Sequence, residues 1–140
     1  DVEKECRHTV MGLRLIEQVA SDPHRTLFLH CTVGEDSTGY LAGLSRMVHD
    51  GWTKRRAFTR EMCAHGYEAG DPRKPAFVSE VIRAEMTPLY LRMAGLIEDG
   101  VITTETLTAD EIDTSVCDGI ASRPLPRGSW RCRPQTIPGL

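Results

Sequence analysis

The sequence predicts an α/β domain in which helices flank a central sheet, and three observations support this prediction. An apolar, uncharged run, Thr26–His30, has the length and the β-branched and aromatic content of a buried strand. Apolar residues recur at steps of three and four on both sides of this run, which is the periodicity of amphipathic helices. The 140 residues suit one domain, and their hydrophobic content of 40% is sufficient for a core.

The first three expected helices each end where the sequence disfavours further helix. Val2–Ala20 is followed by Ser-Asp-Pro, and proline cannot continue a helix. A second helix is expected from about Thr38 to Asp50, closed by Gly51. A third is expected from Thr53, whose hydroxyl can cap it, to about His65.

Residues 76–99 are predicted to form two helices that meet near their middle. Thr87 followed by Pro88 is a good pair for an N-cap and a first helical turn. Beyond residue 103 the apolar pattern weakens, with a short helix as a candidate at Ala109–Thr114. Residues 1–103 are therefore expected to form the domain, and residues 104–140 an irregular C-terminal extension.

A single strand cannot make a sheet, so Thr26–His30 needs partners. They are expected either in Val101–Thr106 or in sequence before Asp1, and the second is favoured. The chain is accordingly interpreted as the C-terminal portion of an α/β domain.

The five cysteines follow no CxxC or other metal-binding spacing, and their odd number leaves at least one free thiol. Cys6 and Cys63 are expected to be small core residues on helices. Cys117 and Cys132 flank an irregular stretch and are candidates to pair in an oxidising compartment. A cytoplasmic location is favoured, and a secreted or periplasmic one if these two cysteines pair.

Charge and hydropathy exclude several classes of partner. The formal charge of −3, with no long basic stretch, argues against nucleic acid. No apolar run approaches the ~18 residues of a membrane span. No signal peptide is visible, and no metal or cofactor is expected.

The stretch after the predicted strand, from Cys31 into the next helix, has the features of an anion-binding loop. A helix N-terminus exposes unpaired N–H groups and the positive end of the helix dipole. Gly34 and Gly39 supply tight turning and close approach, so the loop can curl around a phosphate. The same surroundings lower the pKa of a cysteine, typically to ~3.5–7.5, which makes Cys31 a candidate nucleophile.

His30-Cys31, five residues, Ser37 and then Thr38-Gly39 resemble the signature loop of the cysteine-dependent protein tyrosine and dual-specificity phosphatases. That signature is His-Cys, five residues, Arg, Ser or Thr, and Gly. The segment GWTKRRAFTREMCAHGY that follows is similar to that of bacterial tyrosine phosphatase-like proteins. The resemblance implies a phosphatase-like fold and hydrolysis of a phosphomonoester through a cysteinyl-phosphate on Cys31. It implies a phosphorylated protein or a small phosphomonoester as the partner, and residues 1–103 as the C-terminal portion of the phosphatase-like domain.

The resemblance also implies roles for the neighbouring residues. Thr38 would hydrogen-bond the sulfur, and His30 would orient the loop and help to depress the thiol pKa. Asp1, 30 positions before Cys31, is a candidate general acid, although its place before a helix equally suits an N-cap. The backbone amides that would hold phosphate are those of Thr32, Val33, Gly34, Glu35, Asp36 and Ser37.

Ser37 occupies the position where the family has arginine. The arginine fork binds two phosphate oxygens and stabilises the transition state, and such an arginine contributes about 10³–10⁵ in rate. Glu35 and Asp36 leave the loop with two acidic side chains and no basic one, and these side chains are expected to point outward. The sequence therefore predicts a severely impaired phosphatase.

Two alternatives stay open at the sequence level. One is a pseudophosphatase that binds phosphate or a phosphopeptide without turnover. The other is a redox role for Cys31. Lys54, Arg55 and Arg56 are interpreted as a solvated helix face, with recognition of an anion as the alternative, and Arg73 and Lys74 as candidates for the rim of the site.

Overall fold

The computed structural model describes residues 1–135, and within this range it contains helices and irregular segments but no strand. The α-helices are α1 (Val2–Ala20), α2 (Asp36–Asp50), α3 (Lys54–Arg56), α4 (Ala76–Val81), α5 (Thr87–Glu98) and α6 (Thr104–Thr108). Two π-helical segments are η1 (Ala57–Met62) and η4 (Ile82–Met86). Four short 3₁₀ segments are η2 (Cys63–His65), η3 (Glu68–Gly70), η5 (Thr114–Cys117) and η6 (Ile120–Ser122).

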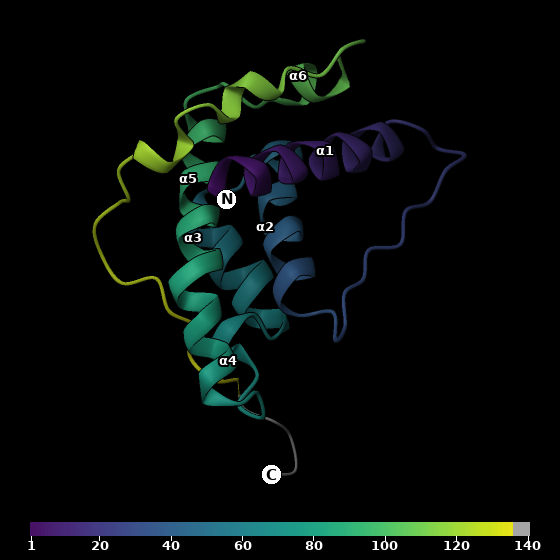
Figure 1. Ribbon diagram of the computed structural model, residues 1–140. Coiled ribbons are helices and arrows are strands. Elements are labelled where there is room, and N and C mark those ends of the chain that lie inside the picture. Colours follow the sequence, from purple (N-terminus) through teal and green to yellow (C-terminus); the bar gives the residue numbers. More distant parts are fainter. Residues whose placement is uncertain (136–140) are drawn as a thin grey trace.

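The helices form a body around one core. Figure 1 shows α1 lying across the ends of α2 and α5, while α3 and the helical run after it lie beside them. The largest fully buried side chains come from α1, α2, η1, α5 and the turn before η3, and include Leu13, Leu44, Phe58, Tyr67 and Tyr90. Buried hydroxyls within the core are paired, since the Tyr67 and Thr87 hydroxyls lie 2.8 Å apart.

Most of the predicted helix positions are confirmed. The helix expected over residues 2–20 is α1, and the helix expected at about 38–50 is α2, which begins two residues earlier. Thr53 caps the next helical run by accepting the Arg56 N–H at 3.1 Å. Gly66 ends that run in the left-handed region with φ of 97°.

Two expectations about helix boundaries are wrong. Residues 76–98 form one continuous helical run, in which η4 precedes Pro88 in place of a break and a cap at Thr87. Proline cannot donate a backbone hydrogen bond, and the wider π-turns carry the chain past that missing donor. The short helix expected at Ala109–Thr114 is displaced, with α6 before it and η5 at its end.

The predicted α/β fold with a central sheet is contradicted by the structure. Thr26–His30 is irregular, and Phe28 in its middle is 81% exposed. The proposed partner, Val101–Thr106, consists of bends and the start of α6, so no strand within residues 1–135 pairs with it. The apolar composition of the run suggested burial, but a strand needs a neighbour to accept its backbone hydrogen bonds.

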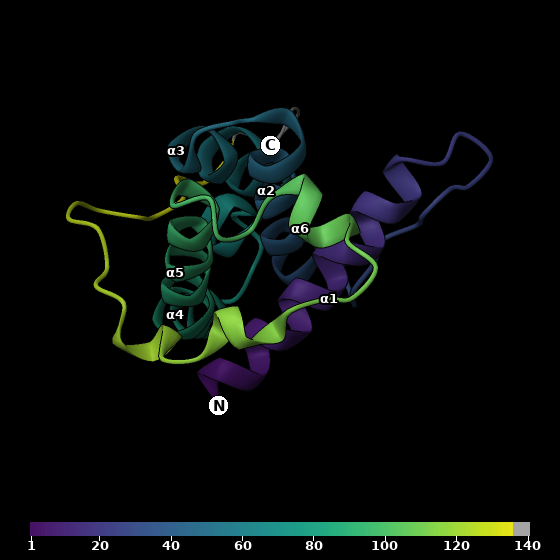
Figure 2. The ribbon, with the colours of Figure 1, turned by 90° about the horizontal axis from the view of Figure 1, so that it is seen from above.

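Residues 21–35 instead form a long segment between α1 and α2 that leaves the helical body, which Figures 1 and 2 both show. The segment carries Cys31 and returns to the body where α2 begins.

Two disulfides attach the C-terminal extension to the body. Cys6 in α1 pairs with Cys117, and Cys63 in η2 pairs with Cys132. The candidate Cys117–Cys132 pair does not form, although Cys6 and Cys63 are buried on helices as predicted. Cys31 is the free thiol. Spacing could not reveal this pairing, because the partners are 111 and 69 residues apart.

Among residues 1–135, no helix is both long enough and apolar enough to cross a membrane.

Candidate functional site

The sulfur of Cys31 lies at the N-terminal end of α2. The Thr38 hydroxyl, on the first turn of α2, donates a hydrogen bond to Cys31 Sγ at 3.1 Å. The backbone amides of Thr38, Gly34 and Glu35 also lie close enough to the sulfur to stabilise its charged form. Gly34 has φ of 73°, a left-handed conformation that costs glycine little and that turns the loop back toward the helix.

These contacts favour the ionised form of the thiol. Partial burial on its own raises the pKa of Cys31, because it disfavours the charged form. The Thr38 hydroxyl and the three amides outweigh burial and lower the pKa from 9.0 to about 7. A substantial fraction of Cys31 is therefore thiolate near neutral pH, which is the nucleophilic form.

The two acidic side chains of the loop both bind Lys74. Its ammonium group lies 3.2 Å from Glu35 Oε2 and 2.6 Å from Asp36 Oδ1, and it donates to the Gly66 carbonyl at 2.6 Å. Lys74 is almost fully buried, with a side chain only 6% exposed. Burial and the neighbouring Asp71 raise the pKa of the Glu35 carboxyl, against the opposing effect of Lys74.

Lys74 has a larger structural role than its sequence position indicates. It was a candidate for the rim, but it lies beneath the loop and joins its two carboxylates to the body. Its separation of 38 residues from Asp36 leaves no local signal for this pairing. Arg73, the other rim candidate, pairs instead with Asp71 on the surface.

A buried glutamate connects the start of α2 to the C-terminal extension. The Glu68 N–H donates to Asp36 Oδ1 at 2.9 Å, and the Glu68 carboxylate binds Arg83 and accepts the Cys132 N–H at 2.6 Å. Glu68 is fully buried and has φ of 54°, so its conformation depends on these partners. Glu68 thus joins the beginning of α2 to Arg83 and to the C-terminal extension.

Asp1 and Ser37 line one cavity of about 500 Å³. The cavity lies between α1, the first turns of α2, and the junction of η4 and α5, and Glu5, Glu85 and His8 also line it. Asp1 Oδ1 accepts the Glu3 and Lys4 amides at 3.0 and 3.3 Å, which confirms its role as the N-cap of α1. Ser37 is exposed and has room for a larger side chain.

Among the described residues, three predicted site residues, His30, Thr32 and Val33, make no hydrogen bond to the sulfur. The His30 ring stacks on Phe28, with ring centroids 5.5 Å apart, rather than on the loop. The Thr32 and Val33 side chains are exposed. Of the predicted amides from Thr32 to Ser37, those of Gly34 and Glu35 reach the sulfur, joined by the amide of Thr38.

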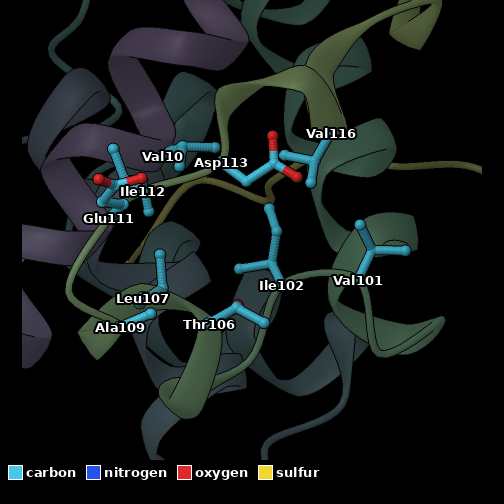
Figure 3. A pocket seen from close by; sticks show the side chains of 10 residues that line it. All are labelled: Val10, Val101, Ile102, Thr106, Leu107, Ala109, Glu111, Ile112, Asp113 and Val116. Carbon is cyan, nitrogen blue, oxygen red and sulfur yellow. The ribbon is translucent and has the colours of Figure 1, made fainter.

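A separate, mostly apolar cavity of about 210 Å³ lies between α1, α6 and the start of the C-terminal extension (Figure 3). Val10, Ile102 and Leu107 line it, and the carboxylates of Glu111 and Asp113 come from the extension. It contains none of the predicted site residues. In the part of the chain that the structure describes, no group of three His, Cys, Asp or Glu residues is placed to hold a metal.

Comparison of the chain with protein-family models, curated proteins and solved structures found no match. Inferences about function therefore depend on the residues around Cys31.

Proposed function

We propose that the protein is related in chemistry to the cysteine-dependent tyrosine and dual-specificity phosphatases, with hydrolysis severely impaired. The observation that carries the proposal is the set of donors on Cys31 Sγ, namely the Thr38 hydroxyl and three backbone amides. Donors that converge on a thiolate also suit the oxygens of a phosphate placed above it.

The proposed reaction has two displacements at phosphorus. The Cys31 thiolate attacks the phosphorus of a phosphomonoester, an S–P bond forms, and the bond to the leaving oxygen breaks. Water then attacks the cysteinyl-phosphate, the S–P bond breaks, and the thiolate returns with inorganic phosphate released. The Thr38 hydroxyl, 3.1 Å from Sγ, stabilises the departing thiolate in this second step.

Asp1 is the proposed acid that protonates the leaving oxygen. Its carboxylate lines the same cavity as Ser37, beside the first turn of α2. The Asp1 carboxylate also caps α1, and the hydrogen bonds of the cap fix its position.

The proposed impairment follows from the lack of a free cation at the loop among residues 1–135. Ser37 carries no charge, and Lys74 is already bound to Glu35 and Asp36. The charge that develops on the phosphate oxygens is then balanced by amides alone.

A second function, binding of phosphate without hydrolysis, is favoured by the same pairing of Lys74 with Glu35 and Asp36. Amide donors without a cation can hold a phosphate but stabilise the transition state poorly, so the loop would serve as a phosphate- or phosphopeptide-binding module. Binding without turnover distinguishes this second function from the first.

The test restores the missing charge with Ser37→Arg and follows hydrolysis of p-nitrophenyl phosphate. Ser37→Lys is the matched control, since it adds charge without the planar fork. Glu5 and Glu85 line the cavity that Ser37 faces and would attract the new guanidinium, so the arginine variant is also made with both changed to glutamine.

We expect kcat/KM to rise by about 10²-fold or more with arginine, and by less with lysine. Cys31→Ser should abolish the gain. If inorganic phosphate protects Cys31 from alkylation but no arginine variant shows turnover, the result would support the binding module. If the folded protein shows no protection of Cys31 by phosphate and no turnover, both functions are refuted.

A further inference from the structure

We propose that a cluster of arginines at the start of the third helical run binds ligands that carry several phosphate groups. The cluster surrounds a cavity of about 510 Å³ lined by Thr53, Arg55, Arg56, Thr59 and Arg60. No lining residue is acidic, and none belongs to the Cys31 loop. The cluster is therefore a site separate from the one proposed above.

Tryptophans hold two of the three guanidinium groups in place. The Arg55 guanidinium lies 3.5 Å from the ring centroid of Trp130, and its Nη1 donates to the Ser129 carbonyl at 3.1 Å. The Arg56 guanidinium lies 4.1 Å from the ring centroid of Trp52. Stacking fixes the planes of both guanidinium groups, so less side-chain entropy is lost when an anion binds.

In the described part of the chain the three arginines have no carboxylate partner, unlike the two cations beside them. Nearby cations are paired: Lys54 lies 3.1 Å from Glu98, and Arg46 lies 2.9 Å from both Asp50 and Glu61. Within residues 1–135, no ion pair joins Arg55, Arg56 or Arg60 to an acidic side chain. Like charges brought together repel one another, and an anion relieves that repulsion.

The chemistry of the cavity selects phosphate clusters over other anions. A guanidinium binds two oxygens of a phosphate at once, and a phosphate group carries up to about two negative charges where a carboxylate carries one. The cavity is large enough for more than one such group. A nucleic acid is disfavoured, because arginines already stack on Trp52 and Trp130, and the chain carries a net charge of −3.

The chain has a built-in reporter for this site. Its two tryptophans are the two that stack on Arg55 and Arg56, so binding in the cavity changes their emission, while the Cys31 loop contains no tryptophan. The experiment titrates the full chain with inorganic tripolyphosphate and follows intrinsic fluorescence. Citrate is the carboxylate comparison. Phosphatidylcholine vesicles with and without phosphatidic acid test whether a lipid headgroup is also bound.

Arg60→Gln is the informative variant, because Arg60 makes no stacking contact with either indole within the described residues. Arg25→Gln removes the same charge from the exposed segment before α2 and is the matched control. We expect saturable binding of tripolyphosphate that Arg60→Gln weakens about tenfold, the effect of losing one charged hydrogen bond, and that Arg25→Gln leaves unchanged.

Binding of tripolyphosphate with an added response to phosphatidic acid vesicles would extend the site to lipid headgroups, and binding without that response would restrict it to soluble phosphates. The absence of a saturable change, equal loss in both variants, or citrate binding as tightly as tripolyphosphate would overturn the proposal.

Discussion

The helical body and the segment of residues 21–35 differ in how they are held. The body has a buried core and two disulfides, whereas the segment exposes Phe28 and Val33 and carries the free thiol. The polar contacts that join the end of the segment to the body are Thr38 on Cys31 and Lys74 on the two carboxylates at the start of α2. Stability and candidate chemistry therefore lie in different regions, and substitutions can affect them separately.

A large effect on stability is expected from removal of a disulfide in the body. Replacing Cys6 and Cys117 together by alanine should lower the free energy of unfolding by about 2–5 kcal/mol, because the bond joins residues 111 apart and restricts the unfolded chain. Urea denaturation measures the change. Cys31→Ala is the matched control and should cost less than about 1 kcal/mol. If Cys31→Ala lowers the free energy of unfolding as much as loss of the disulfide does, the segment is as important to stability as the body.

A smaller effect is expected where the segment meets the body. Lys74→Met leaves Glu35 and Asp36 without their cation in a mostly buried position. It should cost about 2–4 kcal/mol, slightly less than a fully buried pair, because both carboxylates keep some contact with water. Arg73→Met, which removes an exposed ion pair with Asp71, should cost less than about 1 kcal/mol. Urea denaturation measures both variants. If Lys74→Met and Arg73→Met lower the free energy of unfolding by similar amounts, Lys74 has no anchoring role.

The smallest effect is expected in the middle of the segment. Phe28 is 81% exposed, so Phe28→Ala should change the free energy of unfolding by less than about 0.5 kcal/mol. Phe58→Ala removes a fully buried ring from the core and should cost about 3–5 kcal/mol. A loss above about 1 kcal/mol for Phe28→Ala would mean that the ring packs against the body in solution.

The sequence predicted the helices well, because their apolar periodicity and their ends are local properties. Gly66 and Thr53 marked helix ends that the structure confirms. The fold class was wrong, because the burial of Thr26–His30 was inferred from composition, whereas a sheet depends on partners distant in the sequence.

The candidate site was predicted only in part. The contact between Thr38 and Cys31 spans seven residues, and the resemblance of the loop to the phosphatase signature implied it. Lys74, Glu68 and the disulfide partners reach the site or the body across 32 to 111 residues, and no local pattern encodes these contacts.

The most direct test of the central claim, that Cys31 is an activated thiolate, is the pH dependence of its alkylation by iodoacetamide. The other four cysteines are in disulfides, so the reaction reports one thiol. The rate should rise with pH through an inflection near 7, because the thiolate forms as pH passes the pKa of about 7. Thr38→Val, which removes the hydroxyl donor, should move the inflection to higher pH. An inflection near ~8.5, unchanged by Thr38→Val, would contradict the claim.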